Sequence, residues 1–92
     1  LPLTPGIANR LGVDEGTEGL VIGAVDPNSE AGRKGLRRGF IILEANYTPV
    51  ATVDELRAQI EAAEADGRDA LLLRVQRRND PSRFIAVRLR SE

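Results

Sequence analysis

The sequence predicts one small domain of the mixed α/β (α+β) class, with about five strands, one long helix and one or two short helices. Three observations support this prediction. The chain has 92 residues, which is enough for one domain and too few for two. Apolar runs of strand length alternate with helix signals along it. Turn residues separate these segments, and no internal repeat or linker interrupts residues 1–92, so we expect a single domain over this whole range.

The first residues predict an extended segment followed by a short helix. Leu1-Pro2-Leu3 is typical of an extended chain. Thr4 is a favourable N-cap, and Pro5 suits the first helical position because its missing N–H would have no partner there. Gly12 then ends the helix. The apolar face of this helix is formed by Ile7, Ala8 and Leu11.

A strand and a single helical turn are expected next. Residues 14–18 form a polar connector, and residues 19–25 are rich in the apolar, β-branched side chains that favour strands. Residues 26–29 have turn chemistry, because Asp, Pro, Asn and Ser all favour tight turns. Residues 30–34 predict one helical turn, which Gly35 closes.

The middle of the chain predicts a second buried strand and a tight turn. Residues 40–45 are almost entirely apolar, and Asn46-Tyr47 ends this run. Residues 49–50 predict a short extended stub after the turn. A tyrosine tolerates a positive φ angle poorly, so Tyr47 is an unfavourable residue for such a turn.

The clearest helix begins after Thr52. Thr52 and Glu55 match a capping box, in which each side chain accepts a hydrogen bond from the other residue's backbone N–H. Asp66-Gly67 ends the helix, and Arg57 and Glu61 are spaced as an i,i+4 ion pair. Its apolar stripe consists of Val53, Leu56, Ile60 and Ala63.

Two strands are expected at the end of the chain. Residues 70–77 are dominated by leucine and valine, and residues 79–81 form a turn. Residues 84–89 alternate, which predicts two different faces. Ile85, Val87 and Leu89 lie on one face, opposite Phe84, Ala86 and Arg88.

The composition excludes most catalytic and cofactor chemistry for this chain. It contains no Cys and no His, so thiol nucleophiles, Ser-His-Asp triads and the usual zinc and non-haem iron sites cannot be built from it. It has no phosphate loop and no dinucleotide-binding fingerprint. We therefore expect no catalytic residue, no metal site and no cofactor, and a chain that is not itself an enzyme. No apolar run is long enough to cross a bilayer, so no direct membrane insertion is expected.

The charge pattern leaves two interpretations open. The formal net charge is −1, and the chain has two Phe, one Tyr and no Trp, so we expect no nucleic-acid partner. Arginines nevertheless occur in pairs, at Arg37-Arg38 and Arg77-Arg78. The favoured interpretation is an ordinary solvated surface that mixes acids and bases. The alternative is a local phosphate-binding patch.

Several strings, in the same order, resemble the PDZ domains of bacterial HtrA/DegP-type serine proteases. Leu3-Thr4-Pro5 and residues 8–13 are similar to the family's opening. Residues 35–46 are similar to its G-L-[RK]-x-G-D-x-I-x-x-[VL]-N string. Residues 52–57 resemble the start of its groove helix. Residues 83–89 resemble its last strand, more closely that of the C-terminal PDZ domain in members that have two.

The resemblance implies a partly open five-stranded barrel or sandwich that binds extended or C-terminal peptides of unfolded proteins by β-strand addition. The peptide would lie between the N-terminal strand and the helix over residues 53–65. It further implies a periplasmic serine endopeptidase as the parent protein, homo-oligomeric and active in protein quality control, whose protease domain is a second partner. The implied peptide-binding residues are Leu1, Pro2, Leu3, Val53, Leu56, Arg57 and Ile60. For Val53, Leu56 and Ile60, plain core packing is the alternative.

The chain also departs from the family pattern. The glycine-flanked carboxylate-binding segment of the family would precede Leu1 and is not in this chain. Phe40 stands where Asp is usual, Tyr47 where the turn glycine is usual, and residues 29–34 replace a small, Ala-rich turn. These departures favour the second hypothesis, an assembly or regulatory PDZ domain with a degenerate groove. A third is the PDZ domain of another membrane-associated protease or of a secretion component.

Overall fold

The computed structural model describes residues 1–89, so the last three residues of the expected domain lie outside it. The predicted fold class is confirmed by the order of its elements along the chain. These elements are α1 (Pro5–Leu11), β1 (Leu20–Val21), α2 (Glu30–Arg33), β2 (Ile41–Ala45), β3 (Thr48–Pro49), α3 (Val53–Ala65), β4 (Ala70–Gln76) and β5 (Arg83–Arg88).

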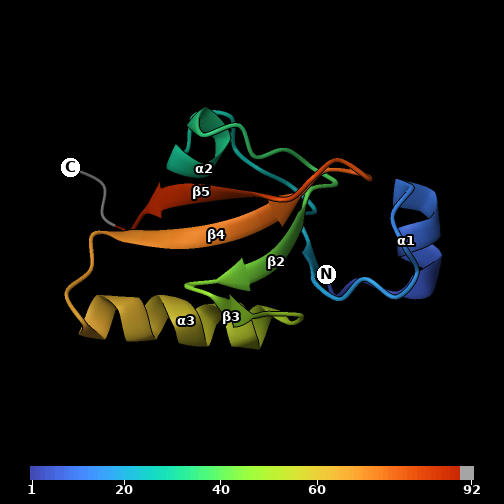
Figure 1. The fold of residues 1–92 in the computed structure, drawn as a ribbon. Helices are drawn as coiled ribbons and strands as arrows, with labels where there is room; N and C mark the ends of the chain where they lie inside the picture. Colours follow the sequence, from blue (N-terminus) through green and yellow to red (C-terminus); the bar gives the residue numbers. More distant parts are fainter. Residues whose placement is uncertain (90–92) are drawn as a thin grey trace.

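Within residues 1–89 the strands form one antiparallel sheet, in the order β1-β2-β4-β5, and β3 pairs with β2. The N-terminal segment continues this sheet beyond β1 through an isolated bridge between Pro2 and Leu20. Helix α3 runs along one side of the sheet, α2 lies next to β5, and α1 stands at one end of the molecule (Figure 1). The sheet is therefore open, with the N-terminal segment along one edge and β5 along the other.

Two apolar clusters hold these layers together. The larger one lies between the sheet and α3, where Ala63 is 2% exposed and Val75 1% exposed. The smaller one joins α1 to the sheet through Ala8 and Ile41, both fully buried, with Val13 and Val21. Alternation along β4 puts Leu71, Leu73 and Val75 into the larger cluster, as the period of a strand requires.

The strand predicted over residues 19–25 is shorter in the structure, where β1 covers only two residues. The partner strand explains this difference. Ile22 still exchanges backbone hydrogen bonds with Gly39 and Phe40, at 2.9 Å each. Gly39 has a φ angle of +92°, which turns the chain away from the sheet. The segment after Ile22 then has no strand beside it within the described residues, because its partner has already turned.

Two smaller expectations also differ from the structure. The stub after the turn covers Thr48–Pro49 rather than residues 49–50. The expected partner of Arg57 was wrong, because its guanidinium lies 3.8 Å from Asp54, one turn earlier, and no pair with Glu61 occurs within residues 1–89. Asp54 belongs to the first helical turn, where a carboxylate also interacts favourably with the helix dipole.

The two residues that depart from the family pattern are both accommodated. Phe40 packs inward and is 7% exposed, as part of the larger cluster. Asn46 and Tyr47 both have positive φ angles, +50° and +66°, which is the geometry of a type I′ hairpin turn between β2 and β3. Asn46 fixes this turn through two hydrogen bonds with Leu72. Its backbone N–H donates to the Leu72 carbonyl at 2.7 Å, and its Oδ1 accepts from the Leu72 N–H at 3.0 Å. The Tyr47 ring lies 5.6 Å from that of Phe84.

Candidate functional site

The N-terminal segment is held to the sheet along one side. The Leu1 amino group donates to the carbonyl of Val21 at 2.9 Å, and the N–H of Val21 donates back to the Leu1 carbonyl at 2.6 Å. The N–H of Leu3 donates to the Gly19 carbonyl at 2.9 Å. Leu1 and Leu3 thus bond inward, toward β1. In an antiparallel ladder the groups of the residue between them point the other way, so only Pro2 faces the outer edge.

This outer edge offers one acceptor and no donor over residues 1–3. Pro2 has a carbonyl oxygen but no N–H, so an added strand would find half of the usual hydrogen-bonding pair there. The side chains differ as well. Leu1 is 67% exposed, Pro2 is exposed, and Leu3 packs against the smaller apolar cluster. Leu1 is therefore the more exposed of the two leucines, and Leu3 is half-buried.

The four predicted residues of α3 divide into two groups. Val53 is 48% exposed, and Arg57 is exposed apart from its loose ion pair with Asp54. Leu56 and Ile60 are half-buried and pack against the larger cluster, so much of their surface already belongs to the core. For Leu56 and Ile60, this contact agrees with the alternative of core packing that the sequence left open.

The larger apolar cluster connects the two parts of the predicted groove. Leu20, which pairs with Pro2 across the bridge, belongs to this cluster, and Leu56 and Ile60 of α3 pack against it. The start of α3 is fixed by the expected capping box. Thr52 Oγ1 accepts from the N–H of Glu55 at 3.1 Å, and Glu55 Oε1 accepts from the N–H of Thr52 at 3.1 Å. The first turn of α3 therefore starts from a defined position.

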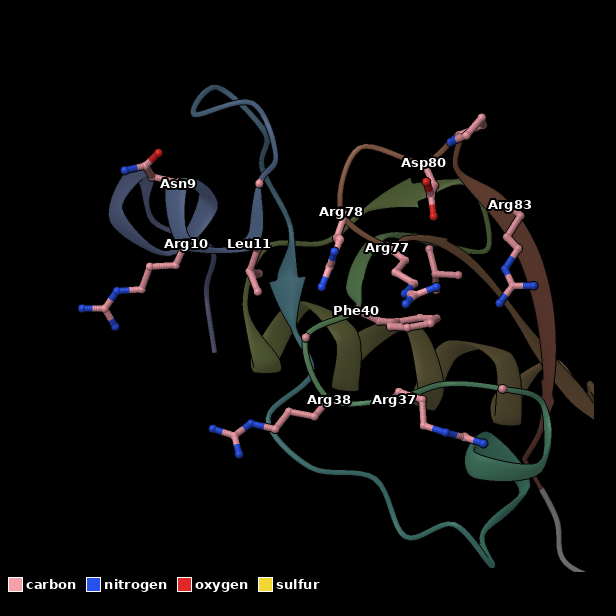
Figure 2. A pocket seen from close by; sticks show the side chains of 15 residues that line it. Asn9, Arg10, Leu11, Arg37, Arg38, Phe40, Arg77, Arg78, Asp80 and Arg83 are labelled. Carbon is pink, nitrogen blue, oxygen red and sulfur yellow. The ribbon is translucent and has the colours of Figure 1, made fainter.

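A concave feature lies elsewhere on the molecule, away from the predicted groove residues. It is a hollow of about 1050 Å³ between the end of α1, residues 35–40 and the β4–β5 turn, and none of the seven predicted site residues lines it. We call it the arginine hollow, because its lining includes Arg10, Arg37, Arg38, Arg77, Arg78 and Arg83. Figure 2 shows Arg77, Arg78 and Arg83 extending toward the ring of Phe40 from the β4–β5 side.

The structure adds two negative findings. Among residues 1–89, no group of three or more acidic side chains is arranged so that it could hold a metal ion. No helix in the same range is both long and apolar enough to span a membrane.

The chain is similar to parts of much longer proteins. It is 41% identical over 78 residues to a DegP-like periplasmic serine endoprotease of Brucella suis, a match that covers 85% of this chain and 15% of the relative. Relatives with the same description in Bartonella henselae and Chlamydia pneumoniae are 43% and 31% identical over 74 and 86 residues. These matches cover 80% and 94% of this chain, but only 14% and 17% of those proteins. The chain thus spans about a sixth of the length of these relatives, and no protein-family model matches it.

Solved structures agree with the fold. The PDZ domain of HtrA3 bound to a phage-derived ligand, FGRWV, superimposes with a TM-score of 0.71 at 29% identity, covering 95% of this chain and 75% of that one. A PDZ domain protein from Parabacteroides distasonis gives a TM-score of 0.62, also at 29% identity, over 76% of this chain and 15% of that one.

Proposed function

Because the chain is a PDZ domain of the HtrA/DegP type, we propose that it binds extended or C-terminal peptide segments by β-strand addition. The peptide lies between the N-terminal segment Leu1–Leu3 and helix α3. In this way the domain recruits substrates to a periplasmic serine endopeptidase that carries it, or regulates that enzyme.

The observation that carries this proposal is an incomplete sheet edge and an incompletely buried helix that share one apolar cluster, through Leu20 and Leu56. Within the described residues the N-terminal segment has a strand on one side only, and such edges are the template for strand addition. Val53, at 48% exposed, keeps apolar surface available at the start of α3. The HtrA3 PDZ domain, which has the same fold, was solved with the peptide FGRWV bound.

The expected affinity is low. Each backbone hydrogen bond contributes about 0.5–1.5 kcal/mol net, and burying one apolar side chain contributes about 1.5–3 kcal/mol. Pro2 removes one of the possible bonds, so a peptide has few of them along residues 1–3. A dissociation constant on the order of micromolar or weaker follows, since 1 μM corresponds to about 8 kcal/mol. Weak binding suits a module that must release many different substrates.

An NMR titration with the peptide FGRWV tests the proposal. We expect shifts in the amides of Leu3 and of residues 53–60, and in the methyl groups of Leu1. Amidation of the peptide's C-terminus then tells whether the free carboxylate contributes. Val53→Glu is expected to weaken binding at least fivefold, because it puts a charge on the apolar surface. Ala58→Glu, an equal change of charge at an exposed position on α3, is the matched control. No shifts at millimolar peptide, or equal affinity for both variants, would overturn the proposal.

A second candidate function is favoured by the same edge. Pro2 withholds a donor, and Leu56 and Ile60 are already packed on the core, so the groove is poorer than an open one. In this alternative the domain is an assembly or regulatory module whose surface contacts sister subunits or the protease domain. Sedimentation of the protease that carries the domain, with and without Leu1→Asp, separates the two functions. Loss of assembly without loss of peptide binding would favour the second.

A further inference from the structure

The arginine hollow concentrates positive charge that the sequence average conceals. Six arginines and one acid, Asp80, line it, which gives a formal charge of +5 in a chain whose net charge is −1. The arginines come from three places that are distant in sequence: the end of α1, the segment before β2, and the β4–β5 turn with the start of β5. The two arginine pairs of the sequence, at residues 37–38 and 77–78, therefore meet around one cavity.

These guanidinium groups have few partners of their own. Within residues 1–89, the salt bridges join Arg57 to Asp54, Arg68 to Asp66 and Arg74 to Glu44, and none involves an arginine of the hollow. Arg37 alone among the six has side-chain hydrogen bonds in that range, to the carbonyls of Gly32 and Leu36 at 2.8 and 2.7 Å. Arg77, Arg78 and Arg83 extend toward Phe40, whereas Arg10 and Arg38 point outward (Figure 2). Asp80 is the one acid among the lining residues, so the like charges repel one another and an anionic ligand would relieve this repulsion.

The shape and the lining of the hollow select among anionic ligands. Its volume of about 1050 Å³ is far more than one phosphate needs. Apolar side chains also line it, among them Leu11, Phe40 and Pro81. Figure 2 shows the Phe40 ring lying flat among the arginines. A ligand that offers carboxylates and apolar groups together would match both parts of this lining.

Two other negatively charged ligands, nucleic acid and an anionic membrane, match the lining of the hollow less well. Proteins that bind single-stranded nucleic acid combine a basic groove with exposed aromatic rings, and the one aromatic residue of the hollow, Phe40, is only 7% exposed. Docking onto an anionic membrane combines basic residues with protruding apolar ones. The large apolar side chains exposed within residues 1–89 are Leu1, Tyr47, Val53 and Phe84, and none of them lines the hollow.

We propose that the arginine hollow is a second binding site, for an acidic segment of a partner protein in which Asp or Glu alternates with apolar residues. The carboxylates pair with the arginines, whose planar forks bind carboxylates through two hydrogen bonds, and the apolar side chains contact Leu11 and Pro81. This site differs from the proposed peptide groove in position, because they share no residue, and in chemistry, because it reads side-chain carboxylates rather than a peptide terminus.

Fluorescence anisotropy with a labelled octapeptide of alternating Glu and Leu tests the proposal. The peptide is amidated, so that it has no terminal carboxylate for the groove to bind. We expect binding that weakens several-fold between 50 and 300 mM NaCl and at least tenfold when Gln replaces Glu in the peptide. Arg77→Glu with Arg83→Glu is expected to weaken binding at least tenfold, while Arg77→Lys with Arg83→Lys retains the charge and a large part of the affinity.

The matched control is Arg68→Glu with Arg88→Glu, which changes the net charge equally at exposed positions outside the hollow. A loss below threefold is expected, and thermal unfolding verifies that each variant is folded. Equal losses of affinity in the two double variants would overturn the proposal, because only the overall charge would then matter.

Other outcomes would also overturn it. In an NMR titration with the same peptide, amide shifts at residues 53–60 instead of 35–40 and 77–83 would place the peptide in the groove. Binding to phosphatidylglycerol vesicles without peptide binding would replace it with a membrane site. Self-association that the hollow variants abolish would replace it with a contact between copies.

Discussion

Two glycines that each lie in a short helix are expected to respond in opposite ways to the same substitution. Gly6 lies in α1 and Gly32 in α2. Helix propensity alone predicts that alanine stabilises both, by about 0.4–1 kcal/mol, because the unfolded chain loses conformational freedom. The structure predicts this result for Gly6 only. A Cβ atom at Gly6 would meet nothing nearer than a side-chain oxygen of Thr4 at 4.0 Å.

At Gly32 the same methyl group would collide with backbone. A Cβ built there would lie 2.8 Å from Cα of Pro27 and closer still to the carbonyl oxygen of Asp26. This oxygen cannot move away easily, since it accepts hydrogen bonds from the N–H and the hydroxyl of Ser29, at 3.0 and 2.6 Å. Ser29 in turn caps α2 by accepting from the N–H of Gly32. The clash would therefore shift both the turn and the helix.

The expected loss of stability for Gly32→Ala is about 2 kcal/mol. It is taken from the upper end of the 1–3 kcal/mol typical of overpacking, because the clash is with backbone atoms, less the gain of about 0.4–1 kcal/mol in propensity. Urea unfolding followed by circular dichroism measures it, and Gly6→Ala serves as the control. With a slope of about 1–2 kcal/mol per molar urea, Gly32→Ala lowers the midpoint by about 1–2 M, while Gly6→Ala raises it slightly. A Gly32→Ala protein as stable as the original would refute the close packing of α2 on residues 26–29.

Four further outcomes follow from the packing and the contacts of single side chains. Thr52→Ala is expected to cost about 1 kcal/mol of unfolding free energy in urea, since it removes the cap of α3. Ile41→Val, at a fully buried site, is expected to cost about 0.5–1.5 kcal/mol in the same assay, and no loss would contradict its burial. Glu44→Gln breaks the 2.9 Å pair with Arg74, but both side chains are partly exposed, so thermal unfolding should show a loss below about 1 kcal/mol that shrinks in high salt. Val53→Glu is expected to change the free energy of unfolding by less than about 0.5 kcal/mol while it lowers the affinity for the peptide FGRWV, and calorimetry can measure both.

The local chemistry of the sequence was enough to predict most of the fold. Thr4 and Thr52 each cap a helix in the structure, as predicted. Alternation correctly put Ile85 and Phe84 on opposite faces of β5, where Ile85 is buried and Phe84 is 50% exposed. These predictions succeeded because capping and alternation depend on neighbours within a few residues. The strand over residues 19–25 was too long because its end depends on where another strand turns, which its own residues do not encode.

The candidate sites were predictable to different degrees for the same reason. The groove residues came from a family resemblance, and the structure shows that Leu56 and Ile60 are largely engaged in the core. The arginine hollow could not be predicted, because its six arginines come from three separate segments and only tertiary structure brings them together. The arginine pairs at residues 37–38 and 77–78 were the available signal, and a solvated surface explained them equally well.

The distribution of charge gives the two proposed sites different preferences. Helix α3, which borders the groove, carries Asp54, Glu55, Glu61 and Glu64 against the single base Arg57. The hollow carries six arginines against Asp80. An acidic segment is therefore repelled along α3 and attracted to the hollow, and a basic peptide has the opposite preference. Because exposed charges are screened beyond about 10 Å at 0.1 M salt, this sorting acts locally, at each site separately. The two proposals together predict that this domain holds two segments of different charge at the same time, with neither competing for the other's position.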